Sequence, residues 1–324
     1  MADIWEEVRL AKTIGIAGHI HPDGDCVGAG LALYNYLTEN YNQDGKKTVD
    51  LYLECVPEAF SFLKNADHVL TKAKEEAQYD LFIALDSSSI DRLGESEALF
   101  SKAKMTYCVD HHITNTHYAK KDTVDANASS TCEVLSDLFD FEKISLPVAE
   151  CLYLGIVYDT GVFKHCNTTE KTMQTAGKLL SLGVNASDII DGTFYQKTYL
   201  QNQILGRCLM ESILVLDGKI IISSISKKIQ DFYEVKPSDL DGVIDQLRVT
   251  KGVEVAIFLR EEAVQEYKVS MRSNGIVDVS KIAVFFGGGG HVKAAGCTMR
   301  GSLYDVINNL TLWIEHQLTN GESK

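Results

Sequence analysis

The chain has 324 residues, of which 45% are hydrophobic, and its formal net charge at pH 7 is −14. This length is enough for two domains of ordinary size, and the hydrophobic fraction allows each of them a normal core. A chain with this much negative charge is a poor general binder of long duplex nucleic acid, because such binding depends on Lys and Arg side chains that neutralise phosphates.

The sequence contains no signal for a membrane or for secretion. No apolar run approaches the ~20 residues that a membrane-spanning helix needs. Residues 1–7 lack the basic and apolar regions of a signal peptide, so we expect a cytoplasmic protein. The eight cysteines include no Cys-x-x-Cys pair, which favours reduced thiols over a disulfide framework or a cysteine-based zinc site.

Apolar runs and helical patterns alternate through the first half of the chain. Strands are predicted at 12–18, 49–55, 80–86 and 105–110, and helices at 26–40, 95–104, 129–141, 146–158 and 170–182. Strands that alternate with helices form βαβ units, so we predict an α/β fold with a mostly parallel sheet and flanking helices.

Acidic and histidine residues follow three of these strands. His19, Asp23 and Asp25 follow the first strand, Asp86 ends another, and the run 110–112 (Asp-His-His) ends the last. The carboxyl ends of the strands in an open α/β sheet form the ligand crevice. We therefore expect these side chains to build one site from distant parts of the chain.

The side-chain types in these clusters favour a divalent metal. Together with Asp159, which follows the predicted helix at 146–158, they combine carboxylate oxygens with imidazole nitrogens. Such ligands suit a hard or borderline ion such as Mn²⁺, and this many carboxylates can hold two ions. Taken one at a time, each cluster could instead be a turn or a helix cap.

The pattern changes after about residue 187. A hairpin is predicted at 209–226 around Asp217-Gly218, because Asp-Gly supplies the positive φ angles of a type I′ turn. Further strands are predicted at 253–260 and 265–272, and helices at 237–247 and 302–317. These elements indicate a second α/β unit with a mixed sheet.

The change of pattern predicts two domains. A catalytic, metal-binding domain is expected at 1–186, a linker of helix and loop at 187–208, and a smaller substrate-binding domain at 209–324. We expect the active site to lie in the cleft between the two domains.

The second predicted domain contains a glycine run at 287–291 (Gly-Gly-Gly-Gly-His). Successive peptide N–H groups in such a run can form a nest for an anion. The run Ser270-Met271-Arg272-Ser273, at the end of a predicted strand, adds a guanidinium and two hydroxyls that suit a phosphate. The alternatives are a flexible loop and an ordinary surface arginine.

These motifs together resemble those of the DHH-family phosphoesterases, over nearly the whole chain. The four N-terminal family motifs are matched in order by His19-x-x-x-Asp23-x-Asp25, Asp86, Asp110-His111-His112 and Asp159. The motif of the DHH-associated C-terminal domain is matched by Gly288-Gly289-Gly290-His291. The chain is most similar to the stand-alone oligoribonucleases that also act as phosphatases of 3′-phosphoadenosine-5′-phosphate (pAp).

The resemblance implies a role for each of these residues. One Mn²⁺ would be held by His19, Asp23 and Asp86, and a second by Asp25, Asp86, His111 and Asp159, with Asp86 bridging. His112 would contact the scissile phosphate. The far end of the nucleotide would be bound by Arg272, Ser273, Gly288, Gly289, Gly290 and His291. We further predict that Asp110 orients His111 by accepting its free ring N–H.

The activity implied is Mn²⁺-dependent hydrolysis of short oligoribonucleotides (nanoRNA, dinucleotides), of pAp, or of both. Expected partners are short RNA or small nucleotides, without long duplex nucleic acid or a membrane, and a homodimer is left open. The alternatives are a cyclic-dinucleotide (c-di-AMP) or pApA phosphodiesterase and a nucleotide-binding regulator without activity. Ala29, where the family usually has Ser, would lie behind the metal ligands and is expected to affect only their surroundings. Lys164-His165, where Arg-Phe is common, leaves the substrate preference open.

Overall fold

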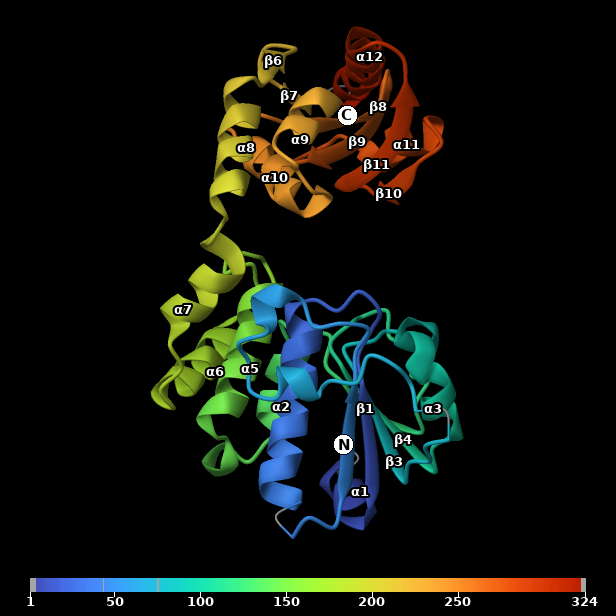
Figure 1. The fold of residues 1–324 in the computed structure, drawn as a ribbon, viewed down its shortest axis with the longest axis vertical. Helices are drawn as coiled ribbons and strands as arrows, with labels where there is room; N and C mark the ends of the chain where they lie inside the picture. Colours follow the sequence, from blue (N-terminus) through green and yellow to red (C-terminus); the bar gives the residue numbers. More distant parts are fainter. Residues whose placement is uncertain (1–3, 43, 75, 322–324) are drawn as a thin grey trace. The chain divides into compact units, whose positions relative to one another are not determined.

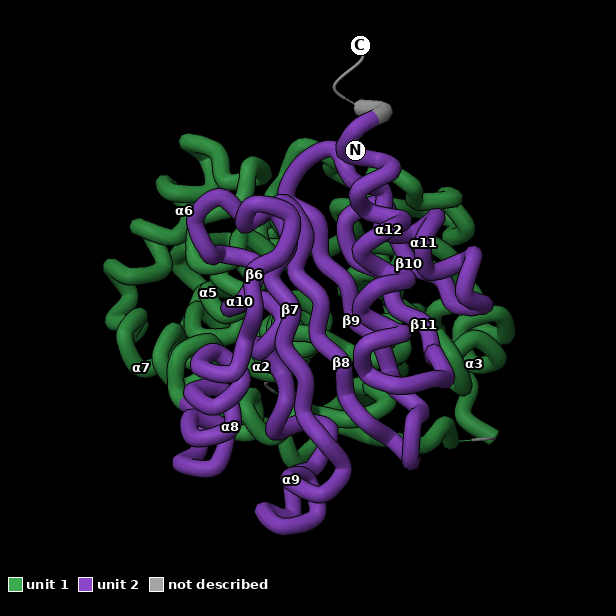
Figure 2. Tube along the Cα trace, turned by 90° about the horizontal axis from the view of Figure 1, so that it is seen from above, with its two compact units in different colours: residues 1–196 green, residues 197–324 purple. Residues whose placement is uncertain are grey.

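The computed structural model describes residues 4–42, 44–74 and 76–321. The chain forms two compact units, Met1–Gln196 and Lys197–Lys324 (Figures 1 and 2). The division falls inside the segment 187–208 that we predicted as a linker, which here contains short helices. Residues 1–3, the first part of the N-terminal segment 1–7, lie outside the described residues.

The first unit is built on a five-stranded sheet in which every pair of neighbouring strands is parallel. In spatial order the strands are β2 (Thr48–Tyr52), β1 (Thr13–Ala17), β3 (Leu81–Leu85), β4 (Met105–Asp110) and β5 (Lys121–Val124). The predicted parallel sheet is therefore confirmed, with β5 as an additional edge strand. Parallel strands bring their carboxyl ends to one edge, so the residues after β1, β3 and β4 lie near one another.

Helices cover both faces of this sheet (Figure 1). They are α1 (Ile4–Leu10), α2 (Gly24–Tyr41), α3 (Glu97–Lys102), α4 (Thr131–Leu138), α5 (Leu146–Asp159), α6 (Glu170–Ser181) and α7 (Ala186–Ile190). The larger core lies under α2 and α5, and a smaller aromatic core lies under α3 on the other face. The predicted helix at 95–104 is shorter, because a 3₁₀ segment, Ile90–Ser96, precedes α3.

The second unit contains a six-stranded mixed sheet in which only β7 and β8 pair in parallel. In spatial order the strands are β10 (Gly289–His291), β11 (Ala294–Arg300), β9 (Glu266–Ser273), β8 (Val255–Ala263), β7 (Ile220–Ile225) and β6 (Ile213–Val215). The predicted turn is confirmed, since Asp217 and Gly218 have φ angles of 52° and 80°. The strand expected from residue 209 begins only at Ile213.

Strand β6 begins later than predicted because α8 (Tyr199–Met210) occupies the residues before it. The remaining helices of this unit are α9 (Lys227–Phe232), α10 (Val243–Arg248), α11 (Val279–Phe285) and α12 (Leu303–Gly321). One core packs beneath α11 and α12, and a second packs beneath α8 and α10. No helix in the described part of the chain is long and apolar enough to span a membrane.

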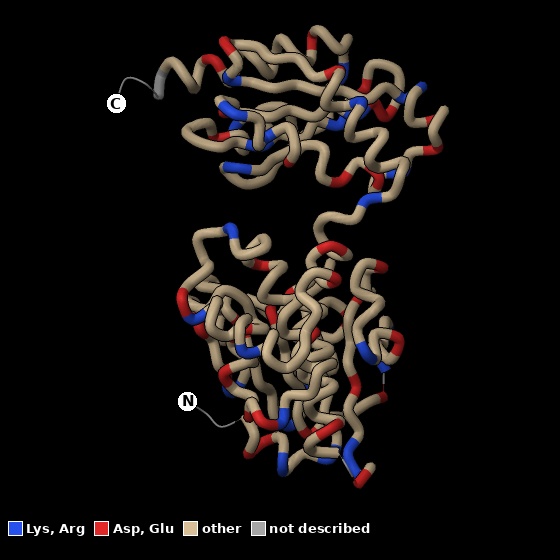
Figure 3. Tube along the Cα trace, turned by 90° about the vertical axis from the view of Figure 1, so that its left-hand side faces the viewer, with Lys and Arg blue, Asp and Glu red and all other residues tan. Residues whose placement is uncertain are grey.

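The two units differ in charge (Figure 3). Residues 1–196 contain 30 Asp and Glu against 16 Lys and Arg, whereas residues 197–324 contain 15 of each kind. The whole excess of negative charge therefore belongs to the first unit. The second unit is neutral overall and opposes an anionic ligand less strongly.

Candidate metal centre and glycine-rich surface

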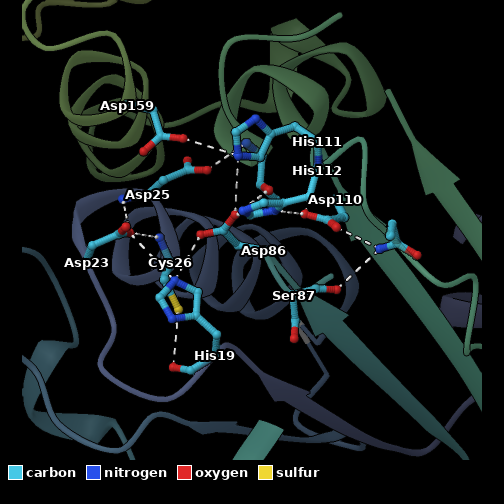
Figure 4. Close-up of polar contacts among 12 residues, drawn as sticks. His19, Asp23, Asp25, Cys26, Asp86, Ser87, Asp110, His111, His112 and Asp159 are labelled. Atoms are coloured by element: carbon cyan, nitrogen blue, oxygen red, sulfur yellow. Dashed lines mark hydrogen bonds and ion pairs between the residues drawn. The ribbon is translucent and has the colours of Figure 1, made fainter. Parts of the chain in front are cut away.

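The predicted metal ligands gather at the carboxyl edge of the first sheet (Figure 4). His19 follows β1, Asp86 follows β3, and Asp110 is the last residue of β4. Asp23 caps α2, and Asp159 is the last residue of α5. The structure thus brings into one cluster His19, Asp23, Asp25, Asp86, Asp110, His111, His112 and Asp159.

Asp86 lies at the centre of this cluster. Its Oδ2 is 3.4 Å from His19 Nε2, and its Oδ1 is 3.6 Å from His111 Nε2. The residue is buried, and its φ angle of 52° is in the left-handed region, which is uncommon for a residue with a side chain. Such backbone strain is often found at functional sites. One carboxylate therefore faces an imidazole on each side.

The first group of ligands surrounds His19. Its Nδ1 lies 2.8 Å from the carbonyl oxygen of Ile20 and donates to it, which leaves the Nε2 lone pair free to bind a metal. Nε2 lies 3.8 Å from Asp23 Oδ1. Burial alone would lower the pKa of His19, but hydrogen bonds to Asp23 and Asp86 outweigh it, so that the pKa is raised.

The second group surrounds His111, whose Nε2 lies 3.1 Å from Asp159 Oδ2. Burial lowers the pKa of His111, but the hydrogen bond to Asp159 and the charge of Asp25 together raise it to about 10. Burial, followed by repulsion from Asp86 and Asp159, raises the pKa of Asp25 well above its usual range. These carboxylates are unfavourable as bare anions, and a divalent cation would relieve their repulsion.

The start of α4 holds Asp25 and Asp86 in place. Asp25 accepts hydrogen bonds from the backbone N–H groups of Thr131 (2.6 Å) and Cys132 (3.0 Å). The Thr131 hydroxyl donates to Asp86 Oδ1 at 3.0 Å. A helix N-terminus favours a carboxylate through its free N–H groups and its dipole. We did not predict this contribution, and the only sequence signal at Thr131 is the preceding Ser130, which caps the helix.

Asp110 has a different partner from the one we expected. Its Oδ1 accepts from the ring Nδ1 of His112 at 2.7 Å and from the backbone N–H of His111 at 2.9 Å. Asn115 donates to Oδ2 at 2.6 Å. The prediction that Asp110 binds the ring of His111 is thus wrong, because that ring faces Asp159. The pKa of Asp110 is lowered, since these hydrogen bonds outweigh burial.

The donor atoms fit divalent metal ions. The described residues include three sets of three His, Cys or Asp side chains that could each hold an ion. Within each set, one ligand atom from each residue lies within 4.8 Å of the other two. The sets are His19 with Cys26 and Asp86, Asp86 with His111 and His112, and Asp25 with His111 and Asp159. Asp86 belongs to the first and second sets and His111 to the second and third, so each set shares a residue with the next.

In the second unit, β9, β11 and the glycine run surround a cavity of about 600 Å³. The polar side chains on its β9 wall are Lys268, Ser270 and Arg272, which alternate with interior residues along the strand. Ser273 belongs to the opposite face, where it is buried and its Oγ lies 3.5 Å from Glu254. Of the two hydroxyls expected at this surface, that of Ser270 lies there, together with Lys268, and that of Ser273 does not.

The glycine run does not form the expected anion nest. The N–H groups of Gly287 and Gly288 donate to carbonyl oxygens at the end of α11, and residues 289–291 form the edge strand β10. Gly288 is needed for close approach, since a Cβ there would lie 2.2 Å from the carbonyl oxygen of Gly296. Gly289 and Gly290 line the cavity, whereas His291 is exposed and is not among its lining residues.

Comparison with known proteins places this architecture in a family. The fold and the cluster define an α/β protein of two units with a carboxylate–histidine centre suited to divalent cations. Residues 13–156 match the DHH family, N-terminal domain, and residues 217–316 match the DHHA1 domain. The chain belongs to the DHH family of phosphoesterases and is a phosphoric ester hydrolase.

Individual relatives match over most of their length. The bifunctional oligoribonuclease and PAP phosphatase NrnA of Thermus thermophilus is 30% identical over 92% of this chain and 90% of its own. The protein of the same name from Bacillus subtilis is 28% identical over 92% of each chain. The crystal structure of an exopolyphosphatase-related protein from Bacteroides fragilis superposes with a TM-score of 0.82 and 25% identity, covering 97% of this chain and 94% of that one.

Proposed function

We propose that this protein hydrolyses phosphoester bonds in short oligoribonucleotides and in pAp with the help of two Mn²⁺ ions. The single observation that carries the proposal is the position of Asp86, whose two oxygens face His19 and His111. The relatives named as oligoribonuclease and PAP phosphatase support the class of substrate.

Two overlapping sets of side chains would hold the ions. The first consists of His19, Asp23 and Asp86, and the second of Asp25, Asp86, His111 and Asp159. When bound, a pair of such ions activates a water molecule as nucleophile near neutral pH and offsets the charge of the phosphoryl oxygens. Thr131 orients Asp86 through its hydroxyl, which limits the movement of the shared carboxylate.

His112 is proposed to contact the phosphoryl group. Asp110 accepts the Nδ1 proton of His112, so that the other ring nitrogen is left for the substrate. The hydrogen bond to Asp110 raises the pKa of His112, which keeps the imidazole positively charged to a higher pH than usual. A positive charge held near the reacting phosphate stabilises the negative charge that develops there.

The cavity of the second unit is proposed to bind the part of the nucleotide that is remote from the cleaved ester. Lys268 and Arg272 supply positive charge, Ser270 a hydroxyl, and the glycines allow close approach of the substrate. A substrate gripped at two points has a limited length. Short nucleotides would therefore be preferred, in line with the negative charge of the first unit, which disfavours long polymers.

Asp86→Ala tests the metal centre. We expect nearly complete loss of turnover and fewer bound manganese ions per chain, because no other carboxylate would contact both ions. Metal content is measured after gel filtration, and turnover with a dinucleotide. The matched control is Asp44→Ala, an exposed carboxylate paired with Lys46. Near-normal turnover with full metal content in Asp86→Ala would refute the two-ion assignment.

A substrate panel separates the candidate activities. Turnover of pAp, a ribodinucleotide, pApA, c-di-AMP and pyrophosphate is compared at equal concentration with Mn²⁺ and after chelation. Preference for pAp and the ribodinucleotide supports the proposal, and preference for c-di-AMP or pApA assigns the alternative phosphodiesterase activity. Tight nucleotide binding without turnover of any of the five would identify a regulator instead.

A further inference from the structure

Cys26 lies beside the proposed first metal position. It is the third residue of α2 and is completely buried. Its Sγ, a ring nitrogen of His19 and a carboxylate oxygen of Asp86 all lie within 4.8 Å of one another. Figure 4 shows the sulfur next to the His19 ring. A buried cysteine is often only a small hydrophobic residue, so the surrounding contacts decide which role it has.

Those contacts are with the backbone and the ring of His19. Its Sγ lies 3.9 Å from the carbonyl oxygen of His19, which is a weak hydrogen bond at best. The space for the sulfur depends on Gly18 at the end of β1, because a Cβ at that position would lie 2.2 Å from Sγ. A glycine therefore makes room for a sulfur atom between the strand end and the metal ligands.

The other donors converge on the same point. His19 Nε2 is the nitrogen that is free to bind a metal, and it lies 3.4 Å from Asp86 Oδ2 and 3.8 Å from Asp23 Oδ1. Two ligand atoms of one tetrahedral zinc ion, with bonds of about 2.0–2.3 Å, lie roughly 3.5 Å apart. Each of the two oxygens lies at about this distance from the nitrogen, and the sulfur lies within 4.8 Å of ligand atoms of His19 and Asp86.

We propose that Cys26 is a further ligand of the first metal position and raises its affinity for thiophilic divalent ions, such as Co²⁺, Zn²⁺ and Cd²⁺, relative to the second position. Binding replaces the thiol proton, which leaves to solvent, by the metal, and no electrons are transferred. Thiolate ligands favour soft and borderline ions, whereas Mn²⁺ prefers oxygen and nitrogen. The inference rests on the proposed metal centre, and it distinguishes the first position from the second, whose proposed ligands are only nitrogen and oxygen.

Cobalt spectroscopy tests the inference without substrate. Metal-free full-length protein is titrated with Co²⁺, and the near-ultraviolet charge-transfer absorption of a cobalt–thiolate bond is recorded. We expect this band in the wild type and its loss in Cys26→Ala and in Cys26→Ser, which preserves the volume of the side chain. The matched control is Cys151→Ala, another completely buried thiol, which belongs to none of the ligand sets among the described residues. This control should keep the band.

Metal competition provides a second measurement. Cd²⁺ affinity should fall by at least about tenfold in Cys26→Ser, which corresponds to ~1.4 kcal/mol, while Mn²⁺ affinity changes much less. Absence of the band from the wild type, or an equal band in both Cys26 variants, would overturn the inference. Neither measurement involves a nucleotide, so a wrong substrate assignment would leave both results unchanged. Circular dichroism of each variant confirms that it has folded.

Discussion

At Asp110 one carboxylate positions two neighbouring residues of the site. It receives hydrogen bonds from the backbone of His111, the ring of His112 and the side chain of Asn115. His111 is thereby directed towards Asp159 as a proposed metal ligand, and His112 is left free for its proposed contact with the substrate. The consecutive histidines therefore have separate proposed roles, which are set by one buried acid.

Asp110→Asn should lower turnover by about 10–100-fold, the usual effect of removing a residue that orients a functional side chain. We expect the loss to resemble that in His112→Ala, with manganese content close to that of the wild type. His111→Ala should instead lose bound metal. The double variant Asp110→Asn/His112→Ala should be little worse than either single variant. Additive losses, or loss of metal in Asp110→Asn, would show that Asp110 supports the metal ligands directly.

At the scale of the elements, the two edges of the parallel sheet have different tasks. The carboxyl edge holds the proposed metal ligands, and the amino edge is held together by Asp80, just before β3. Asp80 accepts from the backbone of Lys12 (2.9 Å) and Thr13 (3.2 Å) at the start of β1, and from Lys104 Nζ (2.7 Å) before β4. One carboxylate thus connects three strands at the edge opposite the site.

Asp80 should therefore contribute stability that depends on pH. The hydrogen bond from Lys104, followed by that from Lys12, lowers the pKa of Asp80 from 3.8 to about 2. A lowered pKa means that the carboxylate stabilises the folded state above about pH 4 and loses this effect as the pH falls towards 2. Solvent screening keeps the contribution to about 1 kcal/mol or less.

The substitution Asp80→Asn tests whether the ionised carboxylate of Asp80 stabilises the folded state. Urea unfolding at pH 7, 5, 4 and 3 should give a lower free energy of unfolding for the variant at neutral pH, and a difference from the wild type that shrinks in acid. Asp91→Asn, a change at an exposed residue, serves as the control. A difference that stays constant over this range would mean that the ionised form of Asp80 is not the stabilising one.

At the scale of the whole molecule, the acidic charge and the proposed anion-binding cavity belong to different units. The first unit carries the entire net charge of −14, and the second is neutral. In the second unit, Nη1 of Arg272 donates a hydrogen bond to the carbonyl oxygen of Met271 at 3.2 Å. Its Nε lies 3.6 Å from Asp245 Oδ1. Its guanidinium is thereby oriented at the wall of the cavity before any substrate binds.

Arg272→Ala should reduce kcat/KM for pAp and for a dinucleotide by roughly ten- to 150-fold, because a charge-assisted contact contributes about 1.5–3 kcal/mol. Bis-p-nitrophenyl phosphate, which is too small to depend on a distal binding site, should be hydrolysed by the variant as fast as by the wild type. The matched control is Arg300→Ala, a change at an exposed arginine of β11 paired with Glu266. Equal losses on all three substrates would place Arg272 in the reaction itself and remove the argument for length selection.

Much of the fold followed from local patterns. Alternating strands and helices predicted the parallel sheet, and Asp-Gly predicted the type I′ turn, because both depend on neighbouring residues. The three clusters at strand ends were expected to meet because parallel strands share an edge. Asp159 was harder to place, since it ends a helix and reaches the cluster only through packing of α5.

By itself, the sequence determined which residue types would meet at the carboxyl edge of the first sheet, because strand direction and chain order suffice for that. The tertiary structure alone decided which atoms face one another. Of the two serines expected at the cavity, it put Ser270 there and Ser273 on the opposite face, since side chains alternate along β9. It also brought Thr131 to Asp86 across 45 residues and Cys26 to the same carboxylate. Contacts of this kind depend on how helices pack on the sheet, which no local pattern encodes.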